Sequence, residues 1–318
     1  MNLNIFKNKY LNWSKYFISP LILIYIIYHI GFGKILSTIQ SFNVYYLLIA
    51  FLIFLFAFLL NFFTIYFLYK PLLRIPILTF FKYRGYSIAW GTFTPMRFGE
   101  FSLSIIFKKK YNRSFLESFT IILFDKVLTF IATCFIFCVS YFILVYFFHN
   151  SFLLYFQKYL LLILIIAFFS FLIFICSSYL HMLLLKIGFL EKSIKKISDS
   201  FSLLYKVYRG HLSAPLIDLL ITFLSMIIIV VPSYILFNSL GFNINFIYLL
   251  FIASAASFFS LIPFTLSGLG IREVFVVYLY SLINVPAPVS LAMMLIFLFY
   301  RYLVSLLFII IFSFSSSG

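Results

Sequence analysis

Apolar runs of 18 or more residues recur along the whole 318-residue chain, and they constrain its fold more than any other feature. Runs of this length are typical of transmembrane helices, because about 20 apolar residues span the hydrocarbon core of a bilayer. The chain is 65% hydrophobic and only 9% charged, whereas about a quarter of the residues of a soluble domain are charged. We therefore expect an all-α polytopic membrane protein that forms one integral-membrane domain over residues 1–318.

Eight apolar segments are separated by short polar connections. They cover residues 17–33, 44–69, 85–107, 115–147, 151–180, 214–238, 247–283 and 287–314. Outside them, four blocks hold 17 of the 23 lysines and arginines: residues 1–16, 70–84, 108–113 and 181–213. Basic residues favour the cytoplasmic side of a membrane, and all four blocks share one side only when segment 85–107 enters and leaves on the same face. We therefore predict that 85–107 is a re-entrant hairpin entered from the cytoplasm and that both termini are cytoplasmic.

Segment 247–283 has the length and the interruptions of a second hairpin. Its 37 residues exceed one span of about 20 residues and fall short of two spans with a turn. Proline and glycine interrupt both hairpins near their centres, at Pro95, Gly99, Pro263, Gly268 and Gly270. We predict that the second hairpin is entered from the outer side, which leaves about six full spans. Paired interrupted segments of this kind are typical of transporters built on inverted repeats.

Charged residues also occur inside the apolar segments, where each costs roughly 2.5–3.5 kcal/mol on insertion scales. Three acids there have a basic neighbour within three residues, and with Arg301 they give a candidate set of seven: Arg97, Glu100, Asp125, Lys126, Arg272, Glu273 and Arg301. The set is net positive, and arginine can bind a phosphate through two parallel hydrogen bonds. We therefore predict that these seven residues bind an anionic substrate group. Two structural roles stay open: Arg97 and Glu100 can pair at i and i+3 to orient the hairpin, and Arg301 can clamp a neighbouring segment or extend toward the membrane surface.

The adjacent residues Asp125 and Lys126 lie about 100° apart around a helix. We expect that they do not satisfy each other and that each finds its partner on another segment. This expectation favours one polar network shared by all three charge pairs.

Residues 192–209 have the pattern of an amphipathic helix, and we predict that this helix lies at the membrane surface. Its apolar residues follow at steps of three and four: Ile194, Ile197, Phe201, Leu204 and Tyr208. Such a helix anchors the chain on anionic lipid, or forms a gate or a docking surface for a partner.

Motifs for metal, nucleotide or covalent catalysis are absent from the sequence. The four histidines have no metal-ligand spacing, and no Walker sequence or GxSxG motif occurs. We therefore predict no catalytic residue, no metal, no cofactor and no nucleic-acid partner.

Three short motifs together resemble a known family. TPMRFGE (residues 94–100), LFDKV (123–127) and LIPFTLSGLGIRE (261–273) follow the order of similar motifs in the transmembrane region of lysylphosphatidylglycerol synthases and in stand-alone proteins of the UPF0104 type. The resemblance runs from about residue 15 to residue 312. Met96 and Ser267 stand where the family often has glycine, and Asp125 and Lys126 stand in for Glu and Arg, so the substrate preference can differ.

The resemblance implies a flippase-like module that moves a phospholipid or a polyprenyl-phosphate-linked lipid between leaflets in cell-envelope biogenesis. The family's cytosolic aminoacyl-transferase domain has no counterpart in these 318 residues, so we do not expect synthase activity. The alternatives are a membrane transferase acting on a lipid-linked substrate and a non-transporting partner of an envelope-synthesis enzyme. Expected partners are anionic membrane lipids, envelope- or glycan-synthesis enzymes and a second copy of the chain. The expected location is a bacterial or archaeal cytoplasmic membrane.

Overall fold

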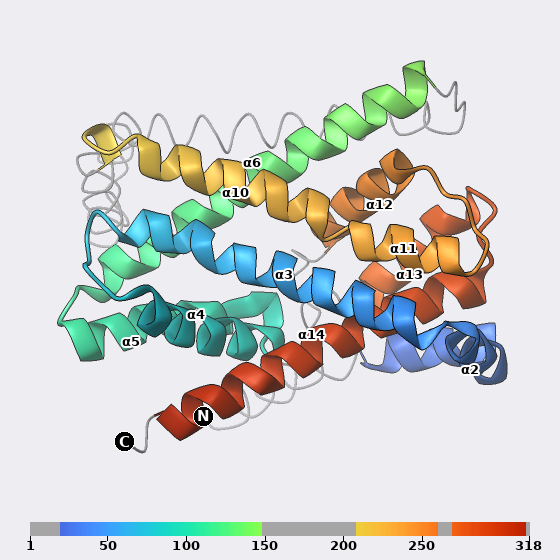
Figure 1. The fold of residues 1–318 in the computed structure, drawn as a ribbon, viewed down its shortest axis with the longest axis horizontal. Coiled ribbons are helices and arrows are strands. Elements are labelled where there is room, and N and C mark those ends of the chain that lie inside the picture. The colour runs from blue at the N-terminus through green and yellow to red at the C-terminus, as the bar shows by residue number, and fades with distance from the viewer. Residues whose placement is uncertain (1–19, 148–207, 260–268, 316–318) are drawn as a thin grey trace, which may run out of the picture. The chain divides into compact units, whose positions relative to one another are not determined.

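The computed structural model describes residues 20–147, 208–259 and 269–315, and in these ranges it is helical, without strands (Figure 1). The chain divides into two compact units, which are described separately. The first unit comprises Met1–Leu55, Gly85–Glu100 and Ile229–Gly318, and the second comprises Phe56–Arg84 and Phe101–Ile228. The prediction of an all-α protein is confirmed for the described part of the chain.

Helices α3 and α4 contribute to both units, and the other elements belong almost entirely to one. The first unit contains the helix Pro20–Ile30, α2 (Phe32–Ser41), the start of α3 (Val44–Tyr69), the end of α4 (Ile77–Thr92), the 3-10 helix η1 (Pro95–Phe101), α11 (Val231–Ser239), α12 (Phe246–Phe259), α13 (Ile271–Ser281) and α14 (Ala287–Ser315). The second unit contains the remainder of α3 and α4, with α5 (Ser102–Tyr111), α6 (Phe115–Tyr146) and α10 (Ser213–Ile228).

Among the described residues, four stretches of helix are long and apolar enough to cross a membrane. They are Val44–Tyr69, Phe115–Tyr146, Ser213–Ser239 and Ala287–Ile310. Their positions confirm the helices predicted at 44–69, 115–147, 214–238 and 287–314. The predicted segment 151–180 and residues 192–207 of the predicted amphipathic helix lie outside the described residues.

The first apolar segment, predicted as a span over 17–33, contains a sharp bend in its described part. Its helix ends at Ile30, and α2 follows at an angle of 84°. Gly31 lies between the two helices with a φ of 97°, a backbone conformation that glycine adopts without a steric penalty. A bent helix pair therefore covers both the described part of this segment and the polar connection expected at 34–43, and it gives a fifth candidate span if the pair counts as one.

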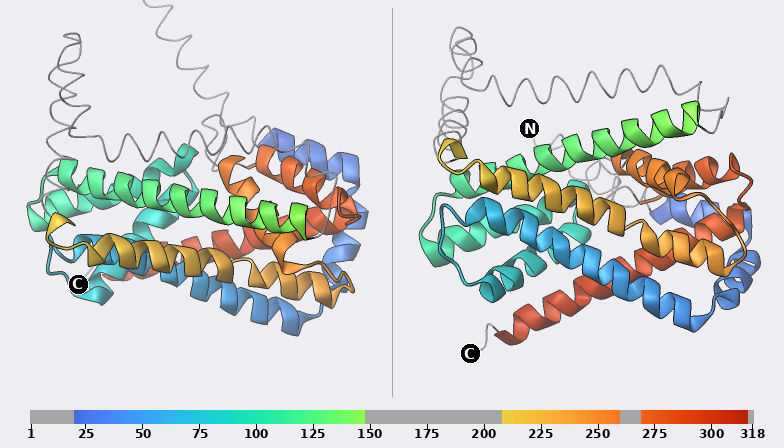
Figure 2. Two further views of the ribbon diagram at one scale, coloured as in Figure 1. Left: turned by 90° about the horizontal axis from the view of Figure 1, so that it is seen from above. Right: turned by 45° about the horizontal axis from the view of Figure 1, so that its top comes forward.

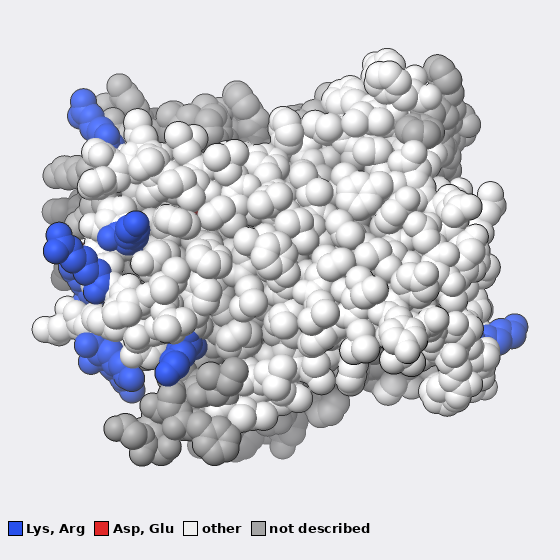
Figure 3. Space-filling view, viewed as in Figure 1, with Lys and Arg blue, Asp and Glu red and all other residues white. Residues whose placement is uncertain are grey.

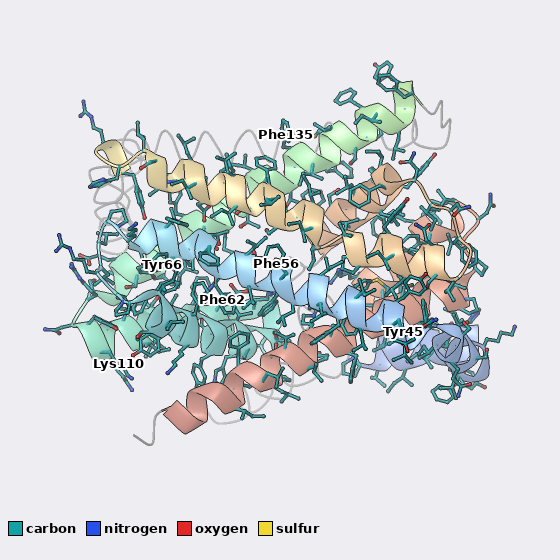
Figure 4. The ribbon with its side chains drawn as sticks, viewed as in Figure 1. Tyr45, Phe56, Phe62, Tyr66, Lys110 and Phe135 are labelled. Carbon is teal, nitrogen blue, oxygen red and sulfur yellow. The ribbon has the colours of Figure 1, made fainter. Side chains whose placement is uncertain are left out.

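Helices α4 and α5 form an antiparallel hairpin that turns at η1. In the second unit, the ring of Tyr83 contacts the rings of Phe107 and Tyr111, and the Lys110 ammonium lies 5.0 Å from the centre of the Tyr83 ring. Figure 4 shows Lys110 at the outer end of α5. The predicted interruption at Pro95 and Gly99 coincides with η1, and the helices on either side extend beyond the predicted 85–107, from Ile77 to Tyr111.

In the first unit, α14 is the central packing element. It contacts both α2 and α13, and α12 contacts both α13 and α11. The Tyr300 hydroxyl donates a hydrogen bond of 2.7 Å to the carbonyl of Leu47 at the start of α3. The hydroxyls of Thr92 and Ser305 are 3.0 Å apart, which joins the end of α4 to α14. Hydroxyl groups thus link helices whose surfaces are otherwise apolar.

In the second unit, α6 packs along α10 and also against α5 (Figure 2). Side-chain hydrogen bonds to backbone carbonyls link the C-terminal end of α3 to α6 and to residues next to α5 and α10. Tyr69 donates to Ser118, Tyr208 to Leu68, and Arg113 to Leu72, with distances of 2.7–2.8 Å. Basic residues from three of the four predicted blocks therefore lie at one end of this unit, where Figure 3 shows a group of lysines and arginines with no acidic residue on the visible face.

Large apolar side chains cover much of the outer surface. Tyr45, Phe56 and Phe135 are each more than half exposed, and Figure 4 shows their positions on α3 and α6. A soluble monomer rarely exposes large contiguous apolar patches. The described surface is therefore suited to contact with lipid chains.

If the α4–α5 hairpin enters and leaves the membrane on one face, Lys82 and Lys110 should be accessible from the same side. Single cysteines at Lys82→Cys and Lys110→Cys, in a chain whose native cysteines are replaced by serine, should react with a membrane-impermeant maleimide from the same side. Labelling from opposite sides would contradict a hairpin that enters and leaves on one face.

Candidate functional site

Five charged residues of the first unit form one group, here called the arginine cluster: Arg97, Glu100, Arg272, Glu273 and Arg301. Arg272 lies within electrostatic range of Glu273 and Arg97. Arg301 lies within electrostatic range of Arg272, Arg97 and Glu273. The cluster therefore combines residues of η1, α13 and α14, and its three cations outnumber its two anions.

Arg97 occupies an unusual backbone conformation at the centre of η1. Its φ is 58°, in the left-handed region, which costs a non-glycine residue roughly 1–2 kcal/mol. Its Nε atom lies 3.2 Å from Oε1 of Glu100, whose side chain is buried while that of Arg97 is 41% exposed. Strained backbone of this kind persists only where the surroundings fix it, and it concentrates at functional sites. The backbone of Arg97 is thus fixed by its surroundings, while its side chain is partly exposed.

Two glycines allow η1 to pack directly on the end of α4. A Cβ atom at Gly99 would lie 2.5 Å from the amide nitrogen of Gly91, and one at Gly91 would lie 2.6 Å from Cγ of Glu100. The Gly99 amide donates a hydrogen bond of 2.7 Å to the Thr94 hydroxyl, and the Ser87 hydroxyl donates to the backbone carbonyl of Glu100. These contacts position both members of the Arg97–Glu100 pair.

Helix α13 begins at a glycine and carries the second charge pair in its first turn. Gly270 has a φ of 89°, and its amide donates to Oε2 of Glu273, which caps the helix. The Glu273 side chain is fully buried, and among the described residues neither its Oε1 nor Nε of Arg272 has a hydrogen-bond partner. Glu273 therefore has a capping role that the sequence analysis did not predict. Pro263 and Gly268 lie outside the described residues.

Helix α14 brings Arg301 to the same group. The Thr92–Ser305 hydrogen bond and the contact between the rings of Phe93 and Tyr302, 5.5 Å apart, fix this part of α14 against the end of α4. Ser305 lies one turn after Arg301, so the guanidinium starts from a helix that is anchored beside η1. The sequence left Arg301 without a local acid, and the structure places it near both Arg272 and Glu273.

The second unit contains a separate group, here called the aspartate cluster: Thr64, Arg84, Asp125, Lys126 and Asp218. Oδ2 of Asp125 lies 3.4 Å from the Lys126 ammonium and 4.0 Å from Nη2 of Arg84, and its Oδ1 accepts a hydrogen bond of 3.3 Å from Thr64. The expectation that Asp125 and Lys126 do not satisfy each other is therefore wrong. The flexible lysine side chain spans the angle between neighbouring helix positions.

Two members of this cluster, Arg84 and Asp218, are not among the site residues predicted from the sequence. Arg84 was assigned to the polar block 70–84, but α4 begins at Ile77 and the arginine is buried. Asp218 lies within the apolar run 214–238 and has no exposed surface. An acid inside such a run was a signal that could have been used, because a charge there is costly.

The structure therefore divides the seven predicted residues between two groups. Five belong to the arginine cluster of the first unit, and Asp125 and Lys126 belong to the aspartate cluster of the second. The first group is net positive, whereas the second has two cations for two anions. Within the described ranges, no group of three or more His, Cys, Asp and Glu side chains is arranged to hold a metal ion.

A comparison with protein families gives one match that covers nearly the whole chain. The family described as "Lysylphosphatidylglycerol synthase TM region" matches residues 12–309. No match is found among curated proteins or among solved structures. The family suspected from the three motifs is thereby confirmed.

Because Gly91 and Gly99 are in close contact, we predict that a methyl group added at Gly99 destabilises the protein. Gly99→Ala should lower the free energy of unfolding by about 1–3 kcal/mol or more, because the added Cβ meets backbone atoms that cannot easily move. Thermal unfolding in detergent measures the effect. Gly33→Ala, in α2 with nothing within 4 Å of its Cβ, is the matched control and should be neutral or stabilising.

The left-handed conformation of Arg97 makes a second prediction about stability. Arg97→Gly and Arg97→Ala both remove the guanidinium, but only glycine adopts this φ without strain. The glycine variant should therefore be more stable by about 1 kcal/mol, measured as the difference in thermal unfolding. Equal stability would show that Arg97 is not strained in the folded protein.

Proposed function

Because the chain belongs to the lysylphosphatidylglycerol synthase TM-region family, we propose that it is a flippase-like transporter that moves an anionic lipid, or a lipid linked to polyprenyl phosphate, between leaflets in cell-envelope biogenesis. Membership of this family and the apolar helices make the chain an integral membrane protein related to lipid modification or transport. The step from that class to lipid transfer is the proposal. Its main support is the arginine cluster.

The arginine cluster has the charge and the donors that a phosphate group needs. Three guanidinium groups from η1, α13 and α14 are within electrostatic range of one another. Like charges repel, so bringing three together in a largely apolar protein is costly unless anions offset them. The two glutamates offset two of the three charges, and Glu273 already accepts the amide of Gly270. An anionic head group supplies the remaining negative charge.

Arginine suits this role because its planar group can donate two parallel hydrogen bonds to a phosphate. Nε of Arg272 is buried and has no hydrogen-bond acceptor among the described residues. Arg97 is partly exposed and pairs with Glu100 across 3.2 Å. In the proposed cycle, Arg97 exchanges Glu100 for the lipid phosphate, and Arg272 and Arg301 hold the phosphate on its other sides.

The positions of the basic residues support a cytoplasmic location for the open ends of the α4–α5 hairpin. Lys110 lies beside Tyr83, and Arg113 bonds to Leu72, so the basic blocks 70–84 and 108–113 are neighbours. Basic loops of this kind favour the cytoplasm. We propose a cytoplasmic membrane location with a re-entrant α4–η1–α5 hairpin, and an inverted counterpart formed by the segment that includes α12 and α13.

The proposal predicts that the arginine cluster is needed for transfer and not for folding. Arg97→Ala and Arg272→Ala should each slow transfer of a fluorescent phosphatidylglycerol in proteoliposomes by about tenfold or more, because a hydrogen bond to a charged group contributes about 1.5–3 kcal/mol. Arg272→Lys should restore part of the rate, since it keeps the charge and loses the planar group.

Arg74→Ala is the matched control, because Arg74 is exposed and belongs to the second unit. It should transfer lipid at the wild-type rate. Full transfer by both Arg97→Ala and Arg272→Ala, in proteins that unfold at the wild-type temperature, would overturn the proposed function.

A further inference from the structure

Asp218 is an acid on α10 that the proposed lipid site does not use. Its side chain has no exposed surface, and among the described residues neither carboxylate oxygen has a hydrogen-bond partner. The hydroxyl of Thr222, one turn further along α10, is likewise buried without a partner in the described part of the chain. A fully buried polar side chain without a donor is uncommon and calls for a physical account.

The charged groups near Asp218 in the described part of the chain come from α4 and α6. Arg84 on α4 and both Asp125 and Lys126 on α6 lie within its electrostatic range. Tyr208, which precedes α10, is also within range, but its hydroxyl donates to the carbonyl of Leu68. Asp218 therefore has two cations near it and no hydrogen bond to either.

Both cations are instead placed against Asp125. Lys126 lies 3.4 Å from Oδ2 of Asp125, and Arg84 lies 4.0 Å from the same atom. The Thr64 hydroxyl also points to Asp125, on its other oxygen. Of the two acids in the aspartate cluster, one thus has three partners and the other has none among the described residues.

An ionised carboxylate at the observed position of Asp218 would be energetically unfavourable. Burying a charge without a partner costs several kcal/mol, and a proton on the carboxylate removes that charge. A metal cation is a poor alternative occupant, because Arg84 and Lys126 would repel it. From this arrangement we propose that Asp218 is a proton-binding site and that its protonation and deprotonation couple lipid transfer to proton movement.

The proposed step moves one proton and changes no other covalent bond. In the proposed protonated state, a proton taken up from bulk water is bound to a carboxylate oxygen of Asp218. On release of that proton, the carboxylate competes with Asp125 for Arg84 or Lys126. The exchange of partners would change the packing among α4, α6 and α10, which carry these residues.

The coupling to lipid transfer rests on the proposed function, but the proton site does not, so it is tested first without any lipid transport. Infrared spectra of the purified wild-type chain at neutral pH should contain the carbonyl band of a protonated carboxyl group. Asp218→Asn should lose this band, and Asp218→Glu should retain it at a shifted frequency. Glu117→Gln, which removes another acid of the second unit, should leave the band unchanged. An unchanged band in Asp218→Asn would overturn the proton site.

The coupling is tested by lipid transfer in proteoliposomes with a pH difference across the membrane. For one proton per lipid, the ratio of labelled phosphatidylglycerol between leaflets should change by up to about tenfold for each pH unit. Asp218→Asn should lose this dependence. A wild-type ratio that follows a sodium gradient and ignores the pH gradient would overturn proton coupling.

The two proposals fail in different ways. Lipid transfer that persists in Arg97→Ala and Arg272→Ala would contradict the proposed lipid site. It would not affect the infrared test of Asp218. Transfer that depends on the arginines but is independent of the pH difference in both wild type and Asp218→Asn would contradict only the coupling of lipid transfer to protons.

Discussion

The structure depends on a single constraint, which is that polar groups inside an apolar chain must find partners within the protein. In a bilayer core no water is available to replace a missing hydrogen bond. Two interruptions of helices in the first unit show how the chain meets this requirement. At η1 the Gly99 amide bonds to the Thr94 side chain, and at the start of α13 the Gly270 amide bonds to Glu273. Local side chains thus make broken helices tolerable, and the breaks place charged residues where a continuous helix could not.

The same constraint explains which features the sequence could predict. Four long apolar helices follow directly from the length of the apolar runs, and the turn at η1 follows from Pro95 and Gly99. These signals are local, because they depend on hydropathy and on residues that break helices. The three family motifs are also local, and they identified the family that the full-length comparison then confirmed.

The features that were missed depend on contacts between segments. The burial of Arg84 could not be read from its polar neighbours, because it arises where α4 meets Asp125 on α6. Likewise, spacing around one helix wrongly separated Asp125 from Lys126, since it ignores the reach of a lysine side chain. The division of the charged residues into two groups is also a property of the tertiary structure. A list of charges in apolar segments gives their number but not their partners.

The two groups differ in which of their charges can change. The cations of the arginine cluster are all guanidinium groups, which remain protonated in proteins. Its two acids have partners, since Glu100 contacts Arg97 and Glu273 accepts the Gly270 amide. A site of this kind keeps its positive charge whatever the pH, which suits the binding of a permanent anion. The aspartate cluster instead contains one acid that is well paired and one that is buried without a partner among the described residues. Of these two groups, the aspartate cluster is thus the one in which the proposed gain or loss of a proton can change which cation pairs with which acid, whereas the arginine cluster suits the proposed binding of an anion.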